Sequence, residues 1–226
     1  MCVIVFKPQG AKAPTVSQLK ACFEHNPHGA GYMLPVNGKV LIRKGFMSYP
    51  DFQSDLVATI KRNGLDPLAT PIVFHFRITT QGGVHKEICH PFPVCRSYKT
   101  MRKLSQTCEM GLAHNGIISL CSEPSYSWHW NEDTGKHERF SKPEPNHNDT
   151  MTFIKDYASL ILGKTAILTP EQNELLLRLS KSKLAIMDGE GNVSLVGKYT
   201  KRDGCYYSNE YSFPTGIAFN AKGGEN

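Results

Sequence analysis

The residues of this chain that could do chemistry begin with Cys2, which directly precedes an apolar run from Val3 to Phe6. If the initiator methionine is removed, Cys2 carries both a thiol nucleophile and a free α-amine that could act as its base. An unperturbed terminal amine titrates at about pH 7.7–8.0, so it can accept a proton at cellular pH. A cysteine that opens a buried strand is more often part of the core, and Cys2 alone therefore does not establish a catalytic role.

Three further positions carry side chains suited to a zwitterionic amino acid. Arg77 ends a predicted strand, where its planar fork could hold an α-carboxylate. Asp149 begins a predicted helix and could accept hydrogen bonds from an α-ammonium group. Asn115 and Gly116 follow a predicted strand, where a side-chain amide and a backbone N–H could stabilise an oxyanion. The plainer alternatives are a surface ion pair for Arg77, a tight turn for Asn115-Gly116 and a helix cap for Asp149.

The order and spacing of these clusters resemble the class II glutamine amidotransferases, which are glutaminase domains of the N-terminal-nucleophile hydrolase superfamily. The resemblance covers the chain from Cys2 to about Leu162, and it is less specific for the stretches 184–196 and 204–209. The motifs that carry it are Cys2, Asn26-Pro27-His28-Gly29-Ala30-Gly31-Tyr32, His75-Phe76-Arg77-Ile78-Thr79-Thr80-Gln81-Gly82-Gly83 with His90-Pro91-Phe92, His114-Asn115-Gly116-Ile117-Ile118 and Asn148-Asp149-Thr150.

The resemblance implies that Cys2 attacks the side-chain amide of glutamine and forms a thioester, which water hydrolyses to give glutamate and ammonia. It assigns the oxyanion to Asn115 and Gly116, and it implies no cofactor and no metal. The residues that it assigns to substrate binding are Arg77, Thr80, Gln81, Gly82 and Asp149. Many family members carry an aromatic residue and a histidine where this chain has Ile78 and Gln81, so the shape and gating of the loop over glutamine stay open.

The chain contains no Gly-rich phosphate loop and no dinucleotide fingerprint that would indicate a synthetase module. We therefore expect either a separate synthetase or acceptor-binding protein that consumes the ammonia, or a free-standing glutamine hydrolase. Two alternatives stay within the superfamily: a catalytically silent binding protein, and a hydrolase of another amide. A zinc module is a further alternative, although its candidate ligands lack a paired Cys-x-x-Cys spacing. These candidates are His75, His85, Cys89, His90 and Cys95.

Composition sets wider limits on function. The 226 residues fit a single domain, and the seven cysteines lack a framework spacing, which favours reduced thiols in the cytoplasm. No apolar stretch is long enough to cross a membrane, and the N-terminus lacks a signal-peptide pattern. The net charge of +6 is mild, and we interpret the basic clusters at 99–103 and 198–202 as solvated surface rather than a nucleic-acid site.

Apolar periodicity and turn residues predict an α+β fold, and the resemblance implies a four-layer αββα sandwich of antiparallel sheets. The second helix should turn Phe52, Leu56, Val57 and Ile60 inward. We expect one domain over 1–226, a polar insertion or lid at 122–147 and a flexible tail at 222–226. The predicted strands are 2–6, 32–36, 40–42, 72–78, 110–114, 184–187, 193–196, 206–207 and 217–219, and the predicted helices are 16–24, 49–63, 149–162 and 170–179.

Overall fold

A computed structural model describes residues 2–79, 83–122, 126–141 and 147–210 of the chain. The substrate-loop predictions for Thr80, Gln81 and Gly82 lie outside the described residues. So do the predicted strand at 217–219 and the predicted tail at 222–226.

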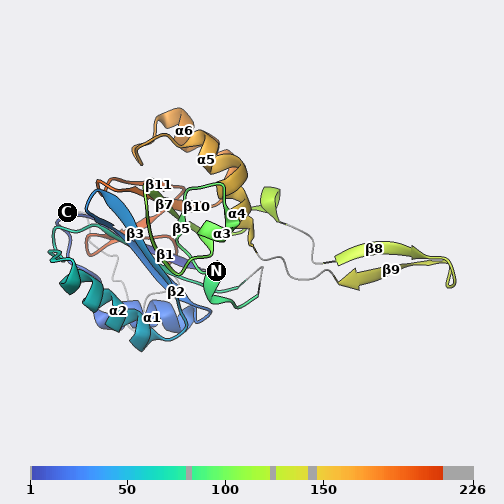
Figure 1. Cartoon of the computed structure of the whole chain (residues 1–226), viewed down its shortest axis with the longest axis horizontal. Helices are drawn as coiled ribbons and strands as arrows, with labels where there is room; N and C mark the ends of the chain where they lie inside the picture. The colour runs from blue at the N-terminus through green and yellow to red at the C-terminus, as the bar shows by residue number, and fades with distance from the viewer. Residues whose placement is uncertain (1, 80–82, 123–125, 142–146, 211–226) are drawn as a thin grey trace, which may run out of the picture.

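The larger sheet is antiparallel, and its N-terminal strand β1 is paired on both sides (Figure 1). The turn between β2 and β3 has left-handed backbone at Asn37 and Gly38, as the Asn-Gly pair predicts for a two-residue hairpin. In spatial order, the strands described are β12 (Thr200–Arg202), β13 (Cys205–Tyr207), β1 (Val3–Lys7), β4 (Ile72–Phe76), β2 (Ala30–Val36), β3 (Lys39–Phe46) and β6 (Ser105–Cys108).

The smaller sheet is also antiparallel, with β7 paired on both sides. Its strands, in spatial order, are β11 (Val193–Val196), β10 (Lys183–Asp188), β7 (Met110–Asn115) and β5 (Phe92–Pro93).

The helices described are α1 (Val16–His25), α2 (Tyr49–Arg62), α3 (Tyr98–Met101), α4 (Asp149–Phe153), α5 (Ser159–Ile161) and α6 (Pro170–Ser180), and a π-helical segment Ile154–Ala158 joins α4 to α5. Two 3₁₀ turns complete the body, at Lys86–Ile88 and Ser119–Cys121.

Helix starts follow the capping signals in the sequence. Thr15 caps α1 and Thr169 caps α6, each in a reciprocal capping box with the glutamine three residues later. These bonds satisfy backbone N–H groups that the first helical turn leaves without partners. Asn148 caps α4 through its side-chain oxygen, which places Asp149 at the first helical position.

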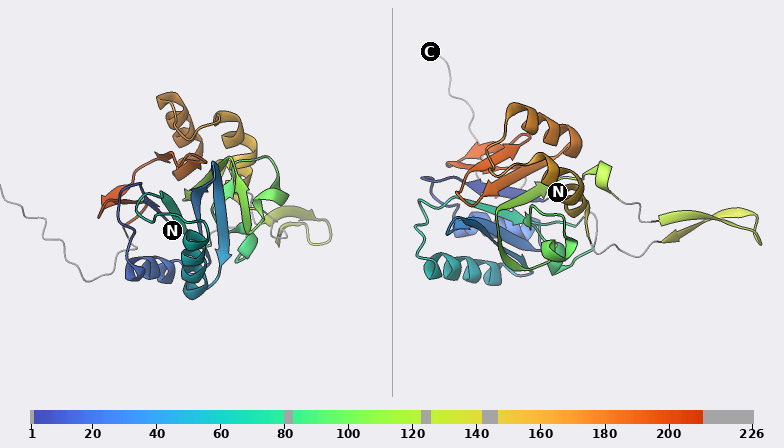
Figure 2. Two further views of the ribbon diagram at one scale, coloured as in Figure 1. Left: turned by 60° about the vertical axis from the view of Figure 1, so that its left-hand side comes forward. Right: turned by 45° about the horizontal axis from the view of Figure 1, so that its top comes forward.

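Successive side chains along each strand point to opposite faces of its sheet, and the core is therefore divided into three clusters. Val3 and Val5 face a cluster with α1 and α2, whereas Ile4 and Phe6 face the smaller sheet. A third cluster packs the other side of the smaller sheet against α4 and α6, through residues such as Leu112. Helices therefore cover the two outer sides of the paired sheets, as Figure 2 shows. The prediction of an α+β chain with antiparallel sheets is confirmed.

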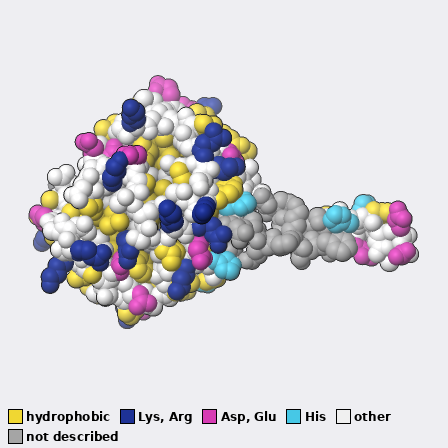
Figure 3. Space-filling view, in the orientation of Figure 1, with side chains coloured by type: hydrophobic (Ala, Val, Ile, Leu, Met, Phe, Trp, Pro, Cys, Tyr) yellow, Lys and Arg dark blue, Asp and Glu magenta, His cyan; other side chains and the backbone are white. Residues whose placement is uncertain are grey.

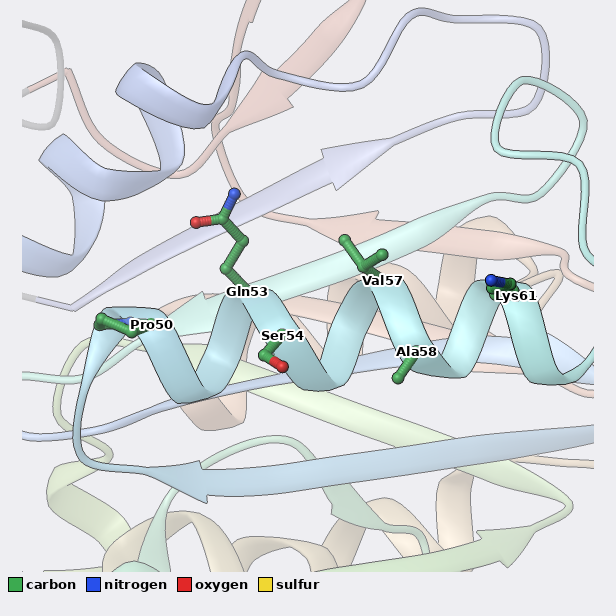
Figure 4. Close-up of a pocket in the computed structure, with 6 residues that line it drawn as sticks. All are labelled: Pro50, Gln53, Ser54, Val57, Ala58 and Lys61. Carbon is green, nitrogen blue, oxygen red and sulfur yellow. The ribbon is translucent and has the colours of Figure 1, made fainter.

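The prediction for Val57 is wrong. Phe52 and Leu56 are buried under the larger sheet, but Val57 is 59% exposed. Val57 is one position past Leu56, and a helix turns by about 100° per residue, which carries it out of the buried stripe. It lies along a shallow hollow on the outside of α2 (Figure 4), which is lined by Pro50, Gln53, Ser54, Val57, Ala58 and Lys61.

The segment 122–147 contains a β-hairpin that the sequence analysis did not predict. Its strands are β8 (Tyr126–Asn131) and β9 (Lys136–Ser141), and they extend away from the rest of the molecule (Figures 1 and 2). The indole rings of Trp128 and Trp130 are 59% and 57% exposed. Among the described residues, the three core clusters include none from this hairpin. Within the described residues, no helix is long and apolar enough to span a membrane.

Candidate active site

Strand pairing brings Cys2 next to Arg77 and Ile78. Strands β1 and β4 run antiparallel, with Val3 opposite Phe76 and Ile4 opposite His75. Continuing this register by one position sets Cys2 beside Arg77, on the face turned toward the smaller sheet. The Cys2 Sγ lies 3.4 Å from both the backbone nitrogen and the carbonyl oxygen of Ile78. Residues that are 76 positions apart in the sequence therefore meet at one sheet edge.

The environment of the Cys2 thiol keeps it protonated. Burial raises its pKa above the ordinary value, and the Ile78 N–H and the Arg77 charge lower it only in part. Within the described part of the chain, the hydrogen bonds of the sulfur go to Ile78 alone, and no histidine or carboxylate is among its partners. A reaction at this sulfur therefore needs a base from elsewhere.

Four of the predicted site residues line one pocket, which we call the Cys2 pocket. They are Cys2, Arg77, Gly116 and Asp149, and they come from four separate segments. Its cavity volume is about 20 Å³, which is space for a single water molecule. The complete lining consists of Cys2, Arg77, Ile78, His90, His114, Gly116, Asn148 and Asp149.

Arg77 is only 3% exposed and is fixed by its backbone and its side chain. Its backbone N–H donates to the Gly29 carbonyl at 2.8 Å, and its carbonyl accepts from the His28 N–H at 2.9 Å. Its Nη1 donates to the Gly83 carbonyl at 2.8 Å, which also accepts from the Thr79 hydroxyl at 3.1 Å. The Arg77 side chain therefore lines the Cys2 pocket and also binds Gly83, which directly follows the predicted substrate-loop residues.

The glycines of the 26–32 motif give this region its close packing. A Cβ on Gly31 would lie 2.2 Å from the His90 carbonyl oxygen, which no real structure tolerates. Strand β2 therefore needs glycine here so that the segment carrying His90 can approach and reach the pocket.

Asp149 joins the start of α4 to the turn after β7. Its carboxylate accepts the Ile118 N–H at 2.7 Å and the Thr150 N–H at 2.8 Å. The plain capping role belongs to its neighbour Asn148, which accepts from Met151 N–H at 2.9 Å. Asp149 therefore combines a structural task with a place in the lining of the Cys2 pocket.

Gly116 lines the pocket, whereas its neighbour Asn115 does not. Gly116 has a φ of 145°, and a Cβ there would lie 2.2 Å from the Ser182 hydroxyl, so only glycine fits. The Asn115 side chain is buried, and its Nδ2 donates to the Ser208 hydroxyl at 2.8 Å. Within the described residues no donor reaches its Oδ1. One of the two Asn115 amide hydrogens is therefore committed to Ser208.

Ser208 and Asn209 complete the surroundings of Cys2, and the sequence analysis gave them no role. The Ser208 hydroxyl also accepts the Ile4 N–H at 2.8 Å, and its backbone N–H donates to the Ile4 carbonyl at 2.9 Å. The Asn209 side chain donates to the Cys2 carbonyl. Ser208 and Asn209 therefore bind the chain at Cys2 and Ile4, and Ser208 also binds the Asn115 side chain. The only signal in the sequence was the weak resemblance of the stretch 204–209.

Three buried histidines, His75, His90 and His114, form a group at the Cys2 pocket, and His90 and His114 belong to its lining. The ring centroids of His75 and His90 lie 4.3 Å apart with the planes tilted by 30°, and the ring centroid of His114 lies 6.1 Å from that of His90. The Thr150 hydroxyl bridges two of them, at 3.0 Å from His90 Nε2 and 2.8 Å from His114 Nδ1. His75 Nε2 bonds the His114 carbonyl at 2.9 Å.

Burial keeps these histidines neutral. It lowers the pKa of His75 to about 3 and that of His114 to about 4, and it lowers the pKa of His90 well below its ordinary value. In the part of the chain that is described, one ring nitrogen of each histidine has no hydrogen-bond partner. The group therefore acts as a neutral, rigid support and supplies no charge to the pocket.

The rival zinc site finds no geometric support. Among the described residues, no three His, Cys, Asp or Glu side chains come together in a way that could hold a metal ion. Neither the comparison with protein-family models nor the search of curated proteins finds a match to this chain.

Proposed function

We propose that this chain is a glutaminase of the class II glutamine amidotransferase type, with Cys2 as an N-terminal nucleophile. The observation that carries the proposal is the convergence of the Cys2 thiol, the Arg77 guanidinium and the Asp149 carboxylate on one pocket. Two further features also support membership of the N-terminal-nucleophile hydrolase superfamily: helices pack on the outer sides of two antiparallel sheets, and Cys2 directly precedes β1, which is paired on both sides within the larger sheet.

The charges of the pocket suit the two ends of a free amino acid. Arg77 binds the α-carboxylate of glutamine, because a planar guanidinium forms two parallel hydrogen bonds to a carboxylate. Asp149 binds the α-ammonium group. A clamp for both charges would have no partner in an apolar acyl amide, which argues against a hydrolase of that kind.

The raised pKa of the Cys2 thiol requires a base, and the α-amine of Cys2 supplies it once Met1 is removed. The amine takes the thiol proton, and the sulfur attacks the δ-carbonyl carbon of glutamine. The Gly116 N–H and the second Asn115 amide hydrogen stabilise the oxyanion. The C–N bond breaks, and the proton goes to the departing ammonia. Water then attacks the thioester, the C–S bond breaks, and glutamate and the free thiol result.

Glutamine is much larger than a cavity of about 20 Å³, so its binding requires the pocket to widen. The contact that competes directly with the substrate is the bond from Arg77 Nη1 to the Gly83 carbonyl. We expect the substrate carboxylate to replace that carbonyl, because a charged acceptor forms a stronger hydrogen bond to guanidinium than a neutral one. The acceptor of the ammonia is a separate protein or, in a free-standing hydrolase, none.

The test combines intact mass with an assay for glutamate formation. We expect a mature chain that starts at Cys2 and releases glutamate and ammonia from glutamine in equal amounts. The Cys2→Ala variant should lose this activity, whereas Cys95→Ala, which removes another partly exposed thiol, should retain it. A diazoketone analogue of glutamine should add one mass adduct to Cys2. A mature chain that starts at Cys2 but forms no glutamate and no adduct would contradict the proposal.

A further inference from the structure

A second hollow lies next to the segment that lines the Cys2 pocket, and we call it the α3 pocket. It has a volume of about 400 Å³, within the range of small-molecule sites. Its lining consists of Glu87, Tyr98, Lys99, Arg102, Lys103 and His147. His147 directly precedes Asn148 and Asp149, which belong to the Cys2 pocket.

The floor of the α3 pocket is fixed by a buried lysine. Lys44 Nζ donates to the Glu87 carbonyl at 2.8 Å and to the Met101 carbonyl at 2.6 Å, and it lies 3.9 Å from the centre of the Phe92 ring. One ammonium group thus joins the 3₁₀ turn Lys86–Ile88 to α3. Because both walls are held from below, the hollow exists before any ligand arrives.

The cations of this pocket have no acidic partner in the part of the chain that the structure describes. Within the described residues, Lys99, Arg102 and Lys103 form no ion pair. Lys99 and Lys103 are exposed and Arg102 is half-buried, and Figure 3 shows Lys and Arg side chains gathered over α3. Like charges on one short turn repel each other, so an anion that binds between them is favoured.

The other walls supply an aromatic surface and a carboxylate. The rings of Tyr98 and His147 stack with centroids 4.4 Å apart and planes 8° apart, and the Tyr98 hydroxyl bonds Thr152 at 3.1 Å. Glu87 is half-buried and belongs to the same lining. Stacked rings suit a planar base, cations suit a phosphate, and a carboxylate suits the hydroxyl groups of a ribose.

We propose that the α3 pocket binds a nucleoside monophosphate. The base stacks on the Tyr98–His147 pair, the phosphate lies between Lys99, Arg102 and Lys103, and Glu87 accepts hydrogen bonds from the ribose. A small ligand fits better than an RNA strand, since the cations line a single hollow and the net charge of the chain is only +6. The binding itself does not depend on chemistry at Cys2.

The experiment is calorimetric titration of the full chain with AMP, GMP, CMP and UMP in turn, and with inorganic phosphate, the matching nucleosides and a short single-stranded RNA as comparisons. We expect at least one nucleotide to bind at one site per chain, more tightly than its nucleoside or phosphate alone. Arg102→Ala should weaken this binding about tenfold or more, because it removes a charged hydrogen-bond donor. Lys61→Ala removes an equal charge from the outside of α2 and should leave the binding unchanged.

Tyr98→Leu should weaken nucleotide binding but not phosphate binding, since it removes the aromatic ring and leaves the three cations in place. The proposal is overturned if none of the four nucleotides binds, or if Arg102→Ala and Lys61→Ala bind them equally well. It is also overturned if phosphate alone binds as tightly as the best nucleotide, or if only the RNA binds. None of these outcomes depends on glutamate formation, so this proposal and the proposed function can fail separately.

Discussion

The Cys2 pocket and the α3 pocket adjoin the same short segment, 147–149, but they hold polar groups in opposite ways. Around Cys2, Arg77, His114 and Asp149 are buried and each has a fixed place in a hydrogen-bond network. Around α3, Lys99 and Lys103 extend into water. The difference suggests that changes at the first pocket alter stability and chemistry together, whereas changes at the second alter only ligand binding.

The largest effect should come from acid. His75, His90 and His114 have lowered pKa values when folded and ordinary values near 6.5 when unfolded, so the unfolded chain binds more protons below about pH 6.5. Their contribution to stability is complete above that pH. It falls by up to about 4 kcal/mol per pH unit for the three together, until the pH approaches the folded pKa values of about 4 and about 3.

Urea unfolding between about pH 7.5 and about pH 5 measures this loss. Among the charged groups, Arg77 disfavours the charged forms of His75 and His90, Lys44 disfavours that of His90, and Asp149 favours that of His114. A free energy of unfolding that stays flat over this range would show that the histidines are not neutral in the folded chain.

The next largest effect concerns the oxyanion. Under the proposed function, Asn115→Ala should lower kcat by a factor of about 100 to 1000, since one oxyanion donor contributes about 3–4 kcal/mol. Ser208→Ala should give a smaller loss, because Ser208 acts on the oxyanion only through Asn115, whose Nδ2 donates to its hydroxyl at 2.8 Å. Glutamate formation under saturating glutamine separates the two variants. Equal losses would mean that Asn115 acts through Ser208 and not on the substrate.

A matched pair on α4 compares the two pockets directly. Thr150→Val removes the hydroxyl that bridges His90 and His114, and it should lower the free energy of unfolding by about 1–3 kcal/mol. Thr152→Val removes the bond to the half-buried Tyr98 hydroxyl and should lower it by less than about 1 kcal/mol. The two substitutions remove the same hydroxyl group, so their difference in urea unfolding reports the burial and the hydrogen bonds of that hydroxyl in each place. Equal losses in the free energy of unfolding would contradict the proposed difference between a buried Cys2 pocket and an exposed α3 pocket.

The smallest effect should come from the cations of the α3 pocket. Lys103→Ala should change the free energy of unfolding by no more than about 0.5 kcal/mol, because the side chain is exposed and has no ion pair within the described residues. A stability loss of several kcal/mol in thermal or urea unfolding would indicate that Lys103 belongs to the fold rather than to a ligand site.

Much of the fold could be predicted because its signals are local. Thr15 begins α1 and Asn37-Gly38 makes the β2–β3 turn, since a cap and a left-handed turn depend only on a few neighbouring residues. The hairpin β8–β9 escaped prediction although Tyr126, Trp128 and Trp130 alternate with polar residues along β8, a pattern that indicates a strand. Val57 was misplaced because it lies just outside the buried stripe of α2.

The candidate site was predictable only in part. Cys2, Arg77, Gly116 and Asp149 could be named from the order of motifs, and they do share a pocket. The roles of Ser208, Asn209 and Thr150 could not, because hydroxyl and amide side chains are common and their partners lie in distant segments. Similarly, the sequence predicted that the basic cluster 99–103 is ordinary solvated surface, and only the structure shows that it shares a pocket with His147 and Glu87.

The sequence by itself determined the elements, the turns and the types of chemical group, because these depend on short-range periodicity and on side-chain chemistry. The tertiary structure alone decided which groups meet. The antiparallel register of β1 on β4 sets Cys2 beside Arg77, and the packing of α4 on the smaller sheet brings Asp149 to the same pocket. The physical reason is that pairing and packing depend on contacts between distant segments, which leave no pattern within any one of them.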